Sequence, residues 1–169
     1  MKQGPAKPAP IYMTPDCARR LRRELKELLY RLRPEMVKTA AWAASNGDRS
    51  ENADYHYAKK TLRKYDGRIR FLTQRLESAT IVDPVAQGAI ANGRVLFGCT
   101  VTVENEEREG RVFSIVGVDE YDPACGYVSW VSPIGRALLG ARKGDVVSFQ
   151  TPGGESELEI LKIEYKALY

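Results

Sequence analysis

Hydrophobic positions recur with a helical period along the first half of the chain. Leucines lie three or four residues apart from Leu21 to Leu32, and a stricter alternation of the same spacings runs from Tyr55 to Ala79. This spacing places each set on one face of an α-helix. Only a short segment around Gly47 separates the two runs, so the predicted helices must pair antiparallel, as a helical hairpin. At 1.5 Å per residue, helices of roughly 25 to 30 residues give a rod about 40 to 45 Å long.

The start of the first helix and one interruption within it are also predicted. Thr14 is a suitable N-cap, and Pro15 fits the first helical position, where a missing N–H loses no hydrogen bond. Pro34 should kink the helix, because it removes a backbone donor and crowds the preceding turn.

The second half of the chain has a different pattern. Short runs rich in β-branched and aromatic residues alternate with turn signals such as Asp122-Pro123. A short helix is predicted over 132–139, with Ser132 as N-cap and Pro133 in its first position. The predicted strands are residues 95–97, 100–104, 111–118, 127–131, 146–151 and 157–165. The sequence thus predicts an antiparallel sheet with one short helix, and the whole chain is assigned to the α+β class.

These patterns divide the chain into four segments. The first ten residues contain three prolines and no helical or strand pattern, which indicates a disordered leader. A stretch with two glycines and little charge follows the second predicted helix and is typical of a linker. We therefore expect a leader over 1–11, a coiled-coil hairpin over 12–82, a linker over 83–92 and a β domain over 93–169.

Charge is unevenly distributed between the two halves. The formal net charge is +4, but residues 1–92 hold 18 Lys and Arg against 10 Asp and Glu, whereas residues 93–169 hold 8 against 12. A basic first half is suited to a polyanion or to an acidic protein surface, and the alternative is a solvated helix surface without a partner.

Cysteine and histidine usage excludes several kinds of site. Cys17, Cys99 and Cys125 are widely spaced and form no C-x-x-C or Cys/His pattern, so neither a disulfide framework nor a zinc site is predicted. His56 is the single histidine, and we expect it at the surface rather than in a catalytic set. The sequence has no P-loop and no membrane-spanning apolar run. A reducing cytoplasm is the expected location.

Three carboxylates, those of Asp48, Glu51 and Asp54, follow Gly47 at the predicted turn. Asp48 and Glu51 have the spacing of a capping box, in which the first caps the second helix and the other folds back. Two such carboxylates can also converge on a hard cation such as Mg²⁺. They would form an incomplete site, so the ion would be shared with a phosphate or with another protein's acids. Spacing alone leaves both interpretations open.

Basic residues dominate the polar positions of the second predicted helix. They could follow a phosphate backbone without reading its sequence, or they could form a solvated face. Trp42, Tyr55 and Tyr57 lie near the turn and could stack on bases, although Tyr55 also fits the apolar seam. The basic stripe nearest the turn consists of Lys59, Lys60, Arg63, Lys64 and Arg68.

The segment around the turn resembles one known family. Residues 42–55 read Trp-Ala-Ala-Ser-Asn-Gly-Asp-Arg-Ser-Glu-Asn-Ala-Asp-Tyr, which closely resembles the hairpin tip of the bacterial transcript cleavage factors GreA and GreB. The aromatic first residue makes it similar to the GreB branch in particular. Further matching segments lie at residues 81–83, 116–120, 132–133, 136–139 and 151–155. The resemblance covers about residues 12–166.

The resemblance implies a fold and a partner. It implies a coiled-coil finger followed by an FKBP-like domain, which docks at the rim of the secondary channel of bacterial RNA polymerase, with the factor acting as a monomer. Where the family commonly has Asp or Asn before the Ser-Pro pair, this chain has Val131, which could weaken docking or shift it to neighbouring acids. The residues implied in docking are Asp119, Glu120, Ser132 and Pro133.

The resemblance also implies a mechanism. Asp48 and Glu51 would help hold a second Mg²⁺ in the polymerase active site and position the attacking water, so that the polymerase hydrolyses backtracked RNA near its 3′ end. The chain alone would not be an enzyme. The residues implied in holding the extruded RNA 3′ segment are Lys59, Lys60, Arg63, Lys64 and Arg68.

Three alternatives remain. A non-catalytic channel binder or inhibitor would use the same hairpin, but the presence of both Asp48 and Glu51 argues against it. A general nucleic-acid-binding hairpin would rest on the basic stripe alone. A prolyl isomerase, suggested by an FKBP-like fold, would need an aromatic-lined pocket, which nothing in the second half predicts.

Overall fold

The computed structural model describes residues 8–47 and 50–169. It is an α+β structure, as predicted, and it forms two compact units. The hairpin unit is Arg19–Ser78, and the sheet unit is Ala79–Tyr169 together with the chain up to Ala18.

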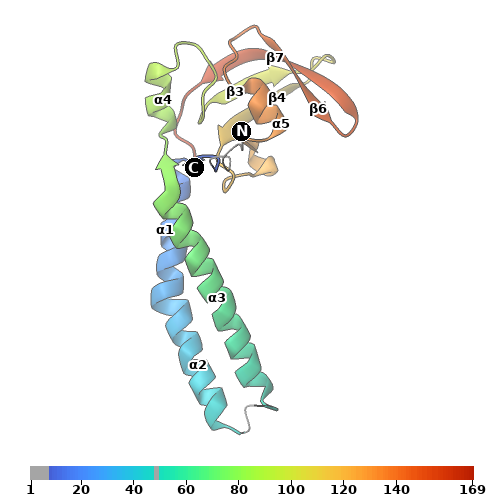
Figure 1. Ribbon diagram of the computed structural model, residues 1–169. Helices are drawn as coiled ribbons and strands as arrows, with labels where there is room; N and C mark the ends of the chain where they lie inside the picture. The colour runs from blue at the N-terminus through green and yellow to red at the C-terminus, as the bar shows by residue number, and fades with distance from the viewer. Residues whose placement is uncertain (1–7, 48–49) are drawn as a thin grey trace, which may run out of the picture. The chain divides into compact units, whose positions relative to one another are not determined.

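The hairpin unit has two antiparallel helical arms (Figure 1), which confirms the predicted helical hairpin. The first arm is α1 (Pro15–Glu27), the π-helical turn η1 (Leu28–Leu32) and α2 (Arg33–Ser45), and the second arm is α3 (Ala53–Ser78). Thr14 caps α1, since its hydroxyl accepts a hydrogen bond from the Cys17 N–H at 3.3 Å. Just before Pro34, where a kink is predicted, the arm contains this π-helical turn, in which the Arg33 N–H donates to the Leu28 carbonyl. Pro34 itself has no N–H to continue the helical pattern.

The seam between the arms is narrow. Leucines fill it along most of its length, and alanines let the arms approach closely near the turn. Among the described residues of this unit, the buried apolar ones are Leu21, Leu28, Ala40, Ala43, Ala58 and Leu72.

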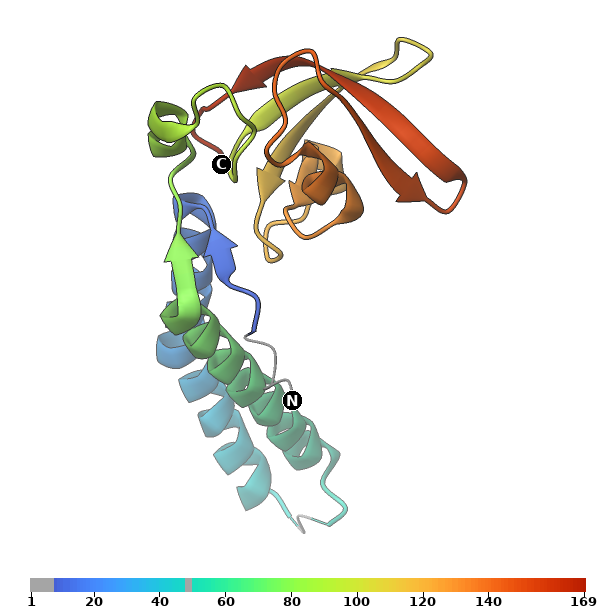
Figure 2. The same ribbon diagram turned by 45° about the horizontal axis from the view of Figure 1, so that its top comes forward.

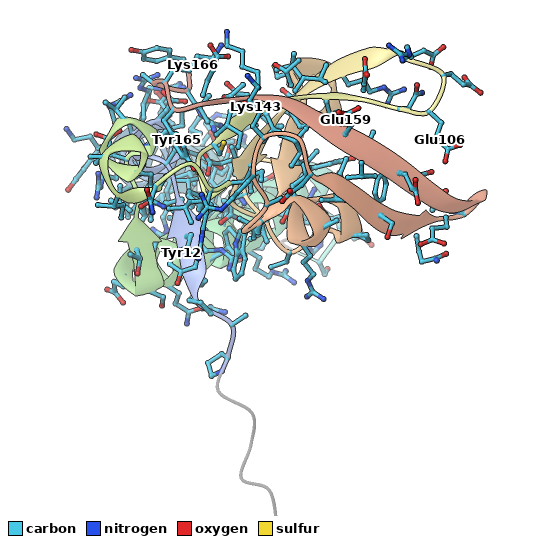
Figure 3. The ribbon with its side chains drawn as sticks, turned by 90° about the horizontal axis from the view of Figure 1, so that it is seen from above. Tyr12, Glu106, Lys143, Glu159, Tyr165 and Lys166 are labelled. Atoms are coloured by element: carbon cyan, nitrogen blue, oxygen red, sulfur yellow. The ribbon has the colours of Figure 1, made fainter. Side chains whose placement is uncertain are left out.

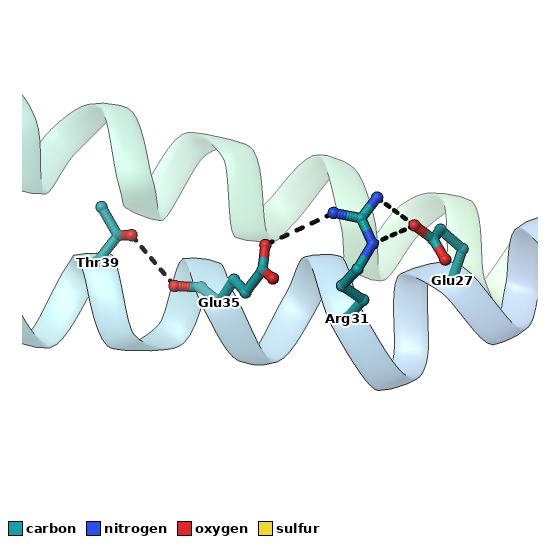
Figure 4. A network of polar contacts seen from close by, with 4 residues as sticks. All are labelled: Glu27, Arg31, Glu35 and Thr39. Atoms are coloured by element: carbon teal, nitrogen blue, oxygen red, sulfur yellow. Dashed lines mark hydrogen bonds and ion pairs between the residues drawn. The ribbon is translucent and has the colours of Figure 1, made fainter.

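Charged side chains cover the outside of the arms. Arg33 Nε donates to Asp66 Oδ1 at 2.7 Å across the hairpin. Along the first arm, Arg31 joins Glu27 to Glu35 (Figure 4), one helical turn to either side. These exposed pairs contribute little stability each, but they keep the arms polar. In the part of the chain that is described, no helix combines the length and the apolar character needed to cross a bilayer.

The sheet unit contains a five-stranded sheet in the order β5-β4-β3-β7-β6. The strands are β3 (Thr100–Glu104), β4 (Gly110–Val116), β5 (Tyr127–Ser129), β6 (Val146–Thr151) and β7 (Gly154–Glu164). The sheet curls around α5 (Pro133–Leu138), as Figures 1 and 2 show. Ser132 caps this helix as predicted, since its Oγ accepts from the Gly135 N–H at 3.1 Å. Leu138 is fully buried in the core that the curl encloses.

One strand pair departs from the predicted antiparallel arrangement. β5 runs parallel to β4, with Ser114 opposite Tyr127, whereas β3 pairs antiparallel with β4 and β7, and β6 pairs antiparallel with β7. The reason is the connection: residues 117–126, which include the 3₁₀ turn η2 (Pro123–Cys125), carry the chain back along the sheet before β5 enters it.

Two other expectations differ from the structure. Residues 95–97 are not a strand, because Val95 forms its backbone hydrogen bonds with a loop: its N–H donates to Ala141 and its carbonyl accepts from Gly140, both at 2.8 Å. The expected linker over 83–92 contains helix α4 (Pro84–Ile90). Asp83 caps that helix by accepting from the Val85 N–H at 3.0 Å.

A small parallel sheet was not expected from the sequence. It pairs β1 (Ile11–Met13) with β2 (Ala79–Ile81), and Figure 2 shows the two strands side by side. The segments lie on either side of the hairpin in sequence and are each only three residues long, so neither carries a strand pattern of its own. Their pairing explains why the sheet unit includes residues from both ends of the hairpin.

Candidate functional site

The first arm ends in a turn that requires glycine. Asn46 closes α2 by donating its N–H to the Ala43 carbonyl at 3.1 Å. Gly47 follows with φ +152°, a backbone conformation that residues with a Cβ rarely adopt. The next two residues, Asp48 and Arg49, lie outside the described residues, so the predicted role of Asp48 stays a prediction.

Asn52 begins the second arm. Its Oδ1 accepts a hydrogen bond from the Tyr55 N–H at 3.1 Å, which is the geometry of an N-cap. Its Nδ2 donates to the Ala43 carbonyl at the end of the first arm. The capping box expected from Asp48 and Glu51 is therefore wrong, because the helix begins four residues later than that motif requires.

The corrected cap leaves Glu51 free of a capping role. Glu51 is exposed in the turn that precedes Asn52, and no other described residue bonds its carboxylate. An exposed carboxylate of this kind is a ligand that Mg²⁺ prefers. One such group is only part of a metal site, and within the described residues no group of three or more Asp, Glu, His or Cys side chains could hold an ion.

Two neighbours of Glu51 are placed as follows. Asp54 is exposed in the first turn of α3, where its negative charge interacts favourably with the positive end of the helix dipole. His56 is exposed, as predicted, and its Nε2 lies 3.2 Å from the Ser50 carbonyl oxygen. The imidazole therefore supports the turn.

The basic stripe forms one band along α3. Lys60, Lys64 and Arg68 follow one another at four-residue intervals as one row, and Arg63, three residues after Lys60, lies beside that row with Lys59 one turn before it. All five are exposed. The five predicted residues therefore share one exposed band of α3, with Lys60, Lys64 and Arg68 as a row within it.

Arg68 is already engaged within the hairpin. Its guanidinium donates two hydrogen bonds to Glu24, at 2.6 and 2.9 Å, and lies 5.1 Å from the centre of the Phe71 ring. The hydrogen bond from Arg68 also lowers the pKa of the Glu24 carboxyl below its ordinary value. Lys60 and Lys64, by contrast, form no ion pair with any described residue.

Aromatic residues near the turn also differ in exposure. Tyr57 and Trp42 are 66% and 59% exposed. Tyr55 is half-buried, which agrees with its predicted place in the seam. Tyr57 precedes Lys60 by one helical turn, so an aromatic ring and the first lysine of the row share one side of α3.

The residues predicted to dock have unequal access to solvent. Glu120 is buried, and its carboxylate accepts hydrogen bonds from the Thr14 N–H at 3.1 Å and the Gly117 N–H at 3.0 Å. The Thr14 hydroxyl donates to the same carboxylate. Glu120 thus holds the start of α1 to the loop after β4, an internal role that the sequence did not reveal.

The other docking candidates lie nearer the surface. Asp119 is half-buried. The Ser132 hydroxyl is used within the fold, since it donates to the Ser129 carbonyl at 2.6 Å while capping α5. Pro133 is exposed at the start of that helix, and Arg136 is exposed one turn later.

Two hollows of the sheet unit differ in chemical character. Tyr12 and Phe97, with ring centres 5.8 Å apart, line an apolar cavity of about 360 Å³. Tyr12 comes from β1, so inspection of the second half alone could not predict these aromatic walls. An acidic hollow of about 230 Å³ lies between the β3–β4 turn and β7. Figure 3 shows two of its residues, Glu106 and Glu159.

Cys99 is a buried thiol. It lies against β4, and burial raises the pKa of its thiol to about 11. A thiol of that kind is not a nucleophile at neutral pH.

Comparison with known proteins identifies the family. A model of the N-terminal part of transcription elongation factors matches residues 11–81, and a model of the C-terminal part of the transcription elongation factors GreA/GreB matches residues 90–165.

Named relatives agree with these matches. Transcription elongation factor GreB of Neisseria meningitidis serogroup B is 47% identical over 154 residues, which cover 91% of this chain and 93% of that protein. GreB of Yersinia pestis is 47% identical over 92% of this chain and 89% of its own length. GreA of Alkalilimnicola ehrlichii is 42% identical over 92% of this chain and 98% of its own length.

Solved structures of similar proteins include the GreA factor homologue Gfh1 of Thermus thermophilus, which is 26% identical with a TM-score of 0.41 over 92% of this chain and 99% of that one. Another is a GreA/GreB elongation factor of Nitrosomonas europaea, 24% identical with a TM-score of 0.41 over the same shares. Because family models match both parts of the chain, and relatives at 47% identity extend over most of it, the chain belongs to the GreA/GreB family of transcription elongation factors.

Proposed function

We propose that this protein is a transcript cleavage factor of the GreB type, which stimulates RNA polymerase to hydrolyse the 3′ part of backtracked RNA. The observation that carries the proposal is the tip of the hairpin. Glu51 offers an exposed carboxylate that no other described residue bonds, at the end of a long antiparallel rod. Family membership agrees with a role in elongation.

In this proposal the chain delivers ligands and the polymerase performs the reaction. Glu51, with Asp48, would help hold a second Mg²⁺, which supplies a Lewis acid for the attacking water and the leaving oxygen. A carboxylate also accepts a hydrogen bond from water and so orients it toward the phosphorus. The protein by itself would cleave nothing, because two carboxylates do not complete a hydrolytic site.

The basic row provides a place for the RNA. Lys60 and Lys64 extend away from the tip along one side of α3, where ammonium groups can pair with successive phosphates. Tyr57, exposed at the tip end of that row, could stack on a base. Arg68 contributes less directly, because Glu24 already occupies its guanidinium.

The sheet unit would bind the polymerase. Of the residues predicted to dock, Pro133 is exposed and Asp119 is partly accessible, and Arg136 is exposed one turn after Pro133. Glu120 and Ser132 would support that surface from within the fold rather than contact the partner. We propose that the protein acts as a monomer in the cytoplasm, where the polymerase works.

The test is a cleavage assay on purified polymerase complexes stalled in a backtracked state. Wild-type protein should shorten the RNA, and the double variant Asp48→Ala with Glu51→Ala should lower the rate by about 100-fold or more, as for loss of a positioned catalytic group. Asp54→Ala is the matched control, since it removes a nearby acid at the same tip and should leave cleavage nearly unchanged. Undiminished cleavage by the double variant would refute the proposed tip chemistry. Inhibition without cleavage by wild type would instead indicate a non-catalytic regulator.

A further inference from the structure

We propose that Asn52 is a positioning residue, which fixes the orientation of the Glu51 carboxylate at the tip by tying the two arms of the hairpin together. The inference rests on the proposed cleavage function and adds a residue to it. It concerns how Glu51 is held, since Glu51 directly precedes Asn52 in the chain.

The bonds of Asn52 join both sides of the turn. Its side-chain amide donates to the Ala43 carbonyl, nine residues earlier, and its Oδ1 accepts from the Tyr55 N–H. Its own carbonyl accepts from the His56 N–H at 3.1 Å. Asn52 is thus fixed to the end of one helix and the start of the other at the same time.

The anchor for these bonds is itself rigid. Ala43 is fully buried, and its carbonyl also accepts from the Asn46 N–H at 3.1 Å, so one carbonyl receives bonds from both ends of the turn. Ala58, on the facing arm, is fully buried as well. Asn46 and Asn52, on either side of the turn, are therefore both bonded to packed backbone, and Glu51 directly precedes Asn52.

Asparagine is specifically suited to this position. It carries an acceptor for the helix cap and a donor for the opposite carbonyl on one short side chain. Serine keeps an acceptor for the cap, but its hydroxyl is too short to bridge to the other arm as well. Aspartate would cap the helix but would turn a carboxylate oxygen toward the Ala43 carbonyl oxygen, and two acceptors repel.

Loss of the bridge should affect rate rather than binding. A catalytic carboxylate that is displaced by an ångström loses much of its effect, although the surfaces that bind the polymerase are unchanged. Asn52→Ser removes the bridge and keeps a capping residue. Asn105→Ser is the matched control, because Asn105 forms a similar pair of bonds in the sheet unit. Its side-chain amide donates to the Glu109 carboxylate, and its Oδ1 accepts from the Glu109 N–H.

The experiment measures cleavage in backtracked complexes over a range of factor and of Mg²⁺ concentrations. For Asn52→Ser we expect a maximal rate about 10-fold lower or more, an unchanged factor concentration at half-maximal rate, and a higher Mg²⁺ requirement. Asn105→Ser should match wild type in all three. Far-UV circular dichroism at the assay temperature identifies variants whose hairpin stays helical, and Asn52→Asp, which also keeps a capping oxygen, provides a second variant if serine unfolds the tip.

The outcomes separate this inference from the proposed function. If Asn52→Ser stays helical and cleaves at the wild-type rate, or loses activity only through a higher half-maximal factor concentration, the positioning role is overturned. If the Asp48→Ala, Glu51→Ala double variant still cleaves in the same assay, the proposed tip chemistry fails, and the positioning role fails with it. Loss of cleavage in the double variant beside full activity in Asn52→Ser overturns the role of Asn52 alone.

Discussion

The thin seam of the hairpin predicts that one leucine carries a large share of its stability. Only three leucines are buried among the described residues of the hairpin unit, and Leu72 is the one with no exposed surface. Leu72→Ala deletes three carbon atoms from this site and leaves a cavity. Leu29 provides the matched control, because it lies in the same unit but is 39% exposed.

The expected magnitude follows from burial. Fully buried Leu→Ala changes cost about 3 to 5 kcal/mol of unfolding free energy, with the lower values where surrounding groups can close the cavity. Two helices with no third layer can move together, so we expect about 3 kcal/mol for Leu72→Ala. Leu29→Ala should cost about 1 kcal/mol or less, because its side chain already keeps part of its surface in water.

The assay is urea unfolding followed by far-UV circular dichroism, which reports the helices of both arms. Leu72→Ala should lower the midpoint much further than Leu29→Ala, with little change in the slope of the transition. Equal losses for the two variants, or a loss below about 1 kcal/mol for Leu72→Ala, would show that the seam is not the main source of hairpin stability.

Three further predictions concern individual side chains. Lys64→Ala should reduce the salt dependence with which the factor binds backtracked complexes in the cleavage assay, lowering the slope of log affinity against log salt by about 0.7. Arg68→Ala should change this slope less. A larger change for Arg68→Ala than for Lys64→Ala would contradict the row proposed for RNA. Glu120→Ala should destabilise the sheet unit by about 2 to 4 kcal/mol in urea, because it leaves buried backbone donors unsatisfied; wild-type stability with lost polymerase binding would instead mark a docking role. Arg68 lowers the folded-state pKa of Glu24, so the stability from this pair is present above the unfolded-state pKa and is lost as the pH falls through the folded-state pKa. A Glu24→Gln variant should therefore lose less stability than wild type on acidification. Parallel losses of the two proteins in acid titrations would disprove the coupling.

Much of the fold was predictable because it depends on local pattern. The helical period from Leu21 to Leu32 and from Tyr55 to Ala79 required two helices, and Gly47 required them to reverse. Ser132 and Pro133 predicted the start of a helix, and α5 begins at Pro133. Each of these signals acts over one or two turns of chain, so a single sequence contains all the information needed to read it.

Other features depend on segments that are distant in sequence. β1 and β2 stabilise each other across a separation of more than sixty residues, and neither is long enough to be recognised alone. The direction of β5 depends on how its connection folds back. Glu120 was expected among the docking residues, but Thr14, far away in the chain, donates to it and makes it an internal hydrogen-bond acceptor.

At the candidate site, the sequence by itself determined which carboxylates lie at the turn, and it located the basic residues along α3. The tertiary structure decided how these groups are used. It placed the helix cap at Asn52 instead of Asp48, and it paired Arg68 with Glu24 across the hairpin. The physical reason is that spacing fixes only which residues are neighbours on one element, whereas a hydrogen bond or an ion pair depends on what the facing element brings within about 3 Å.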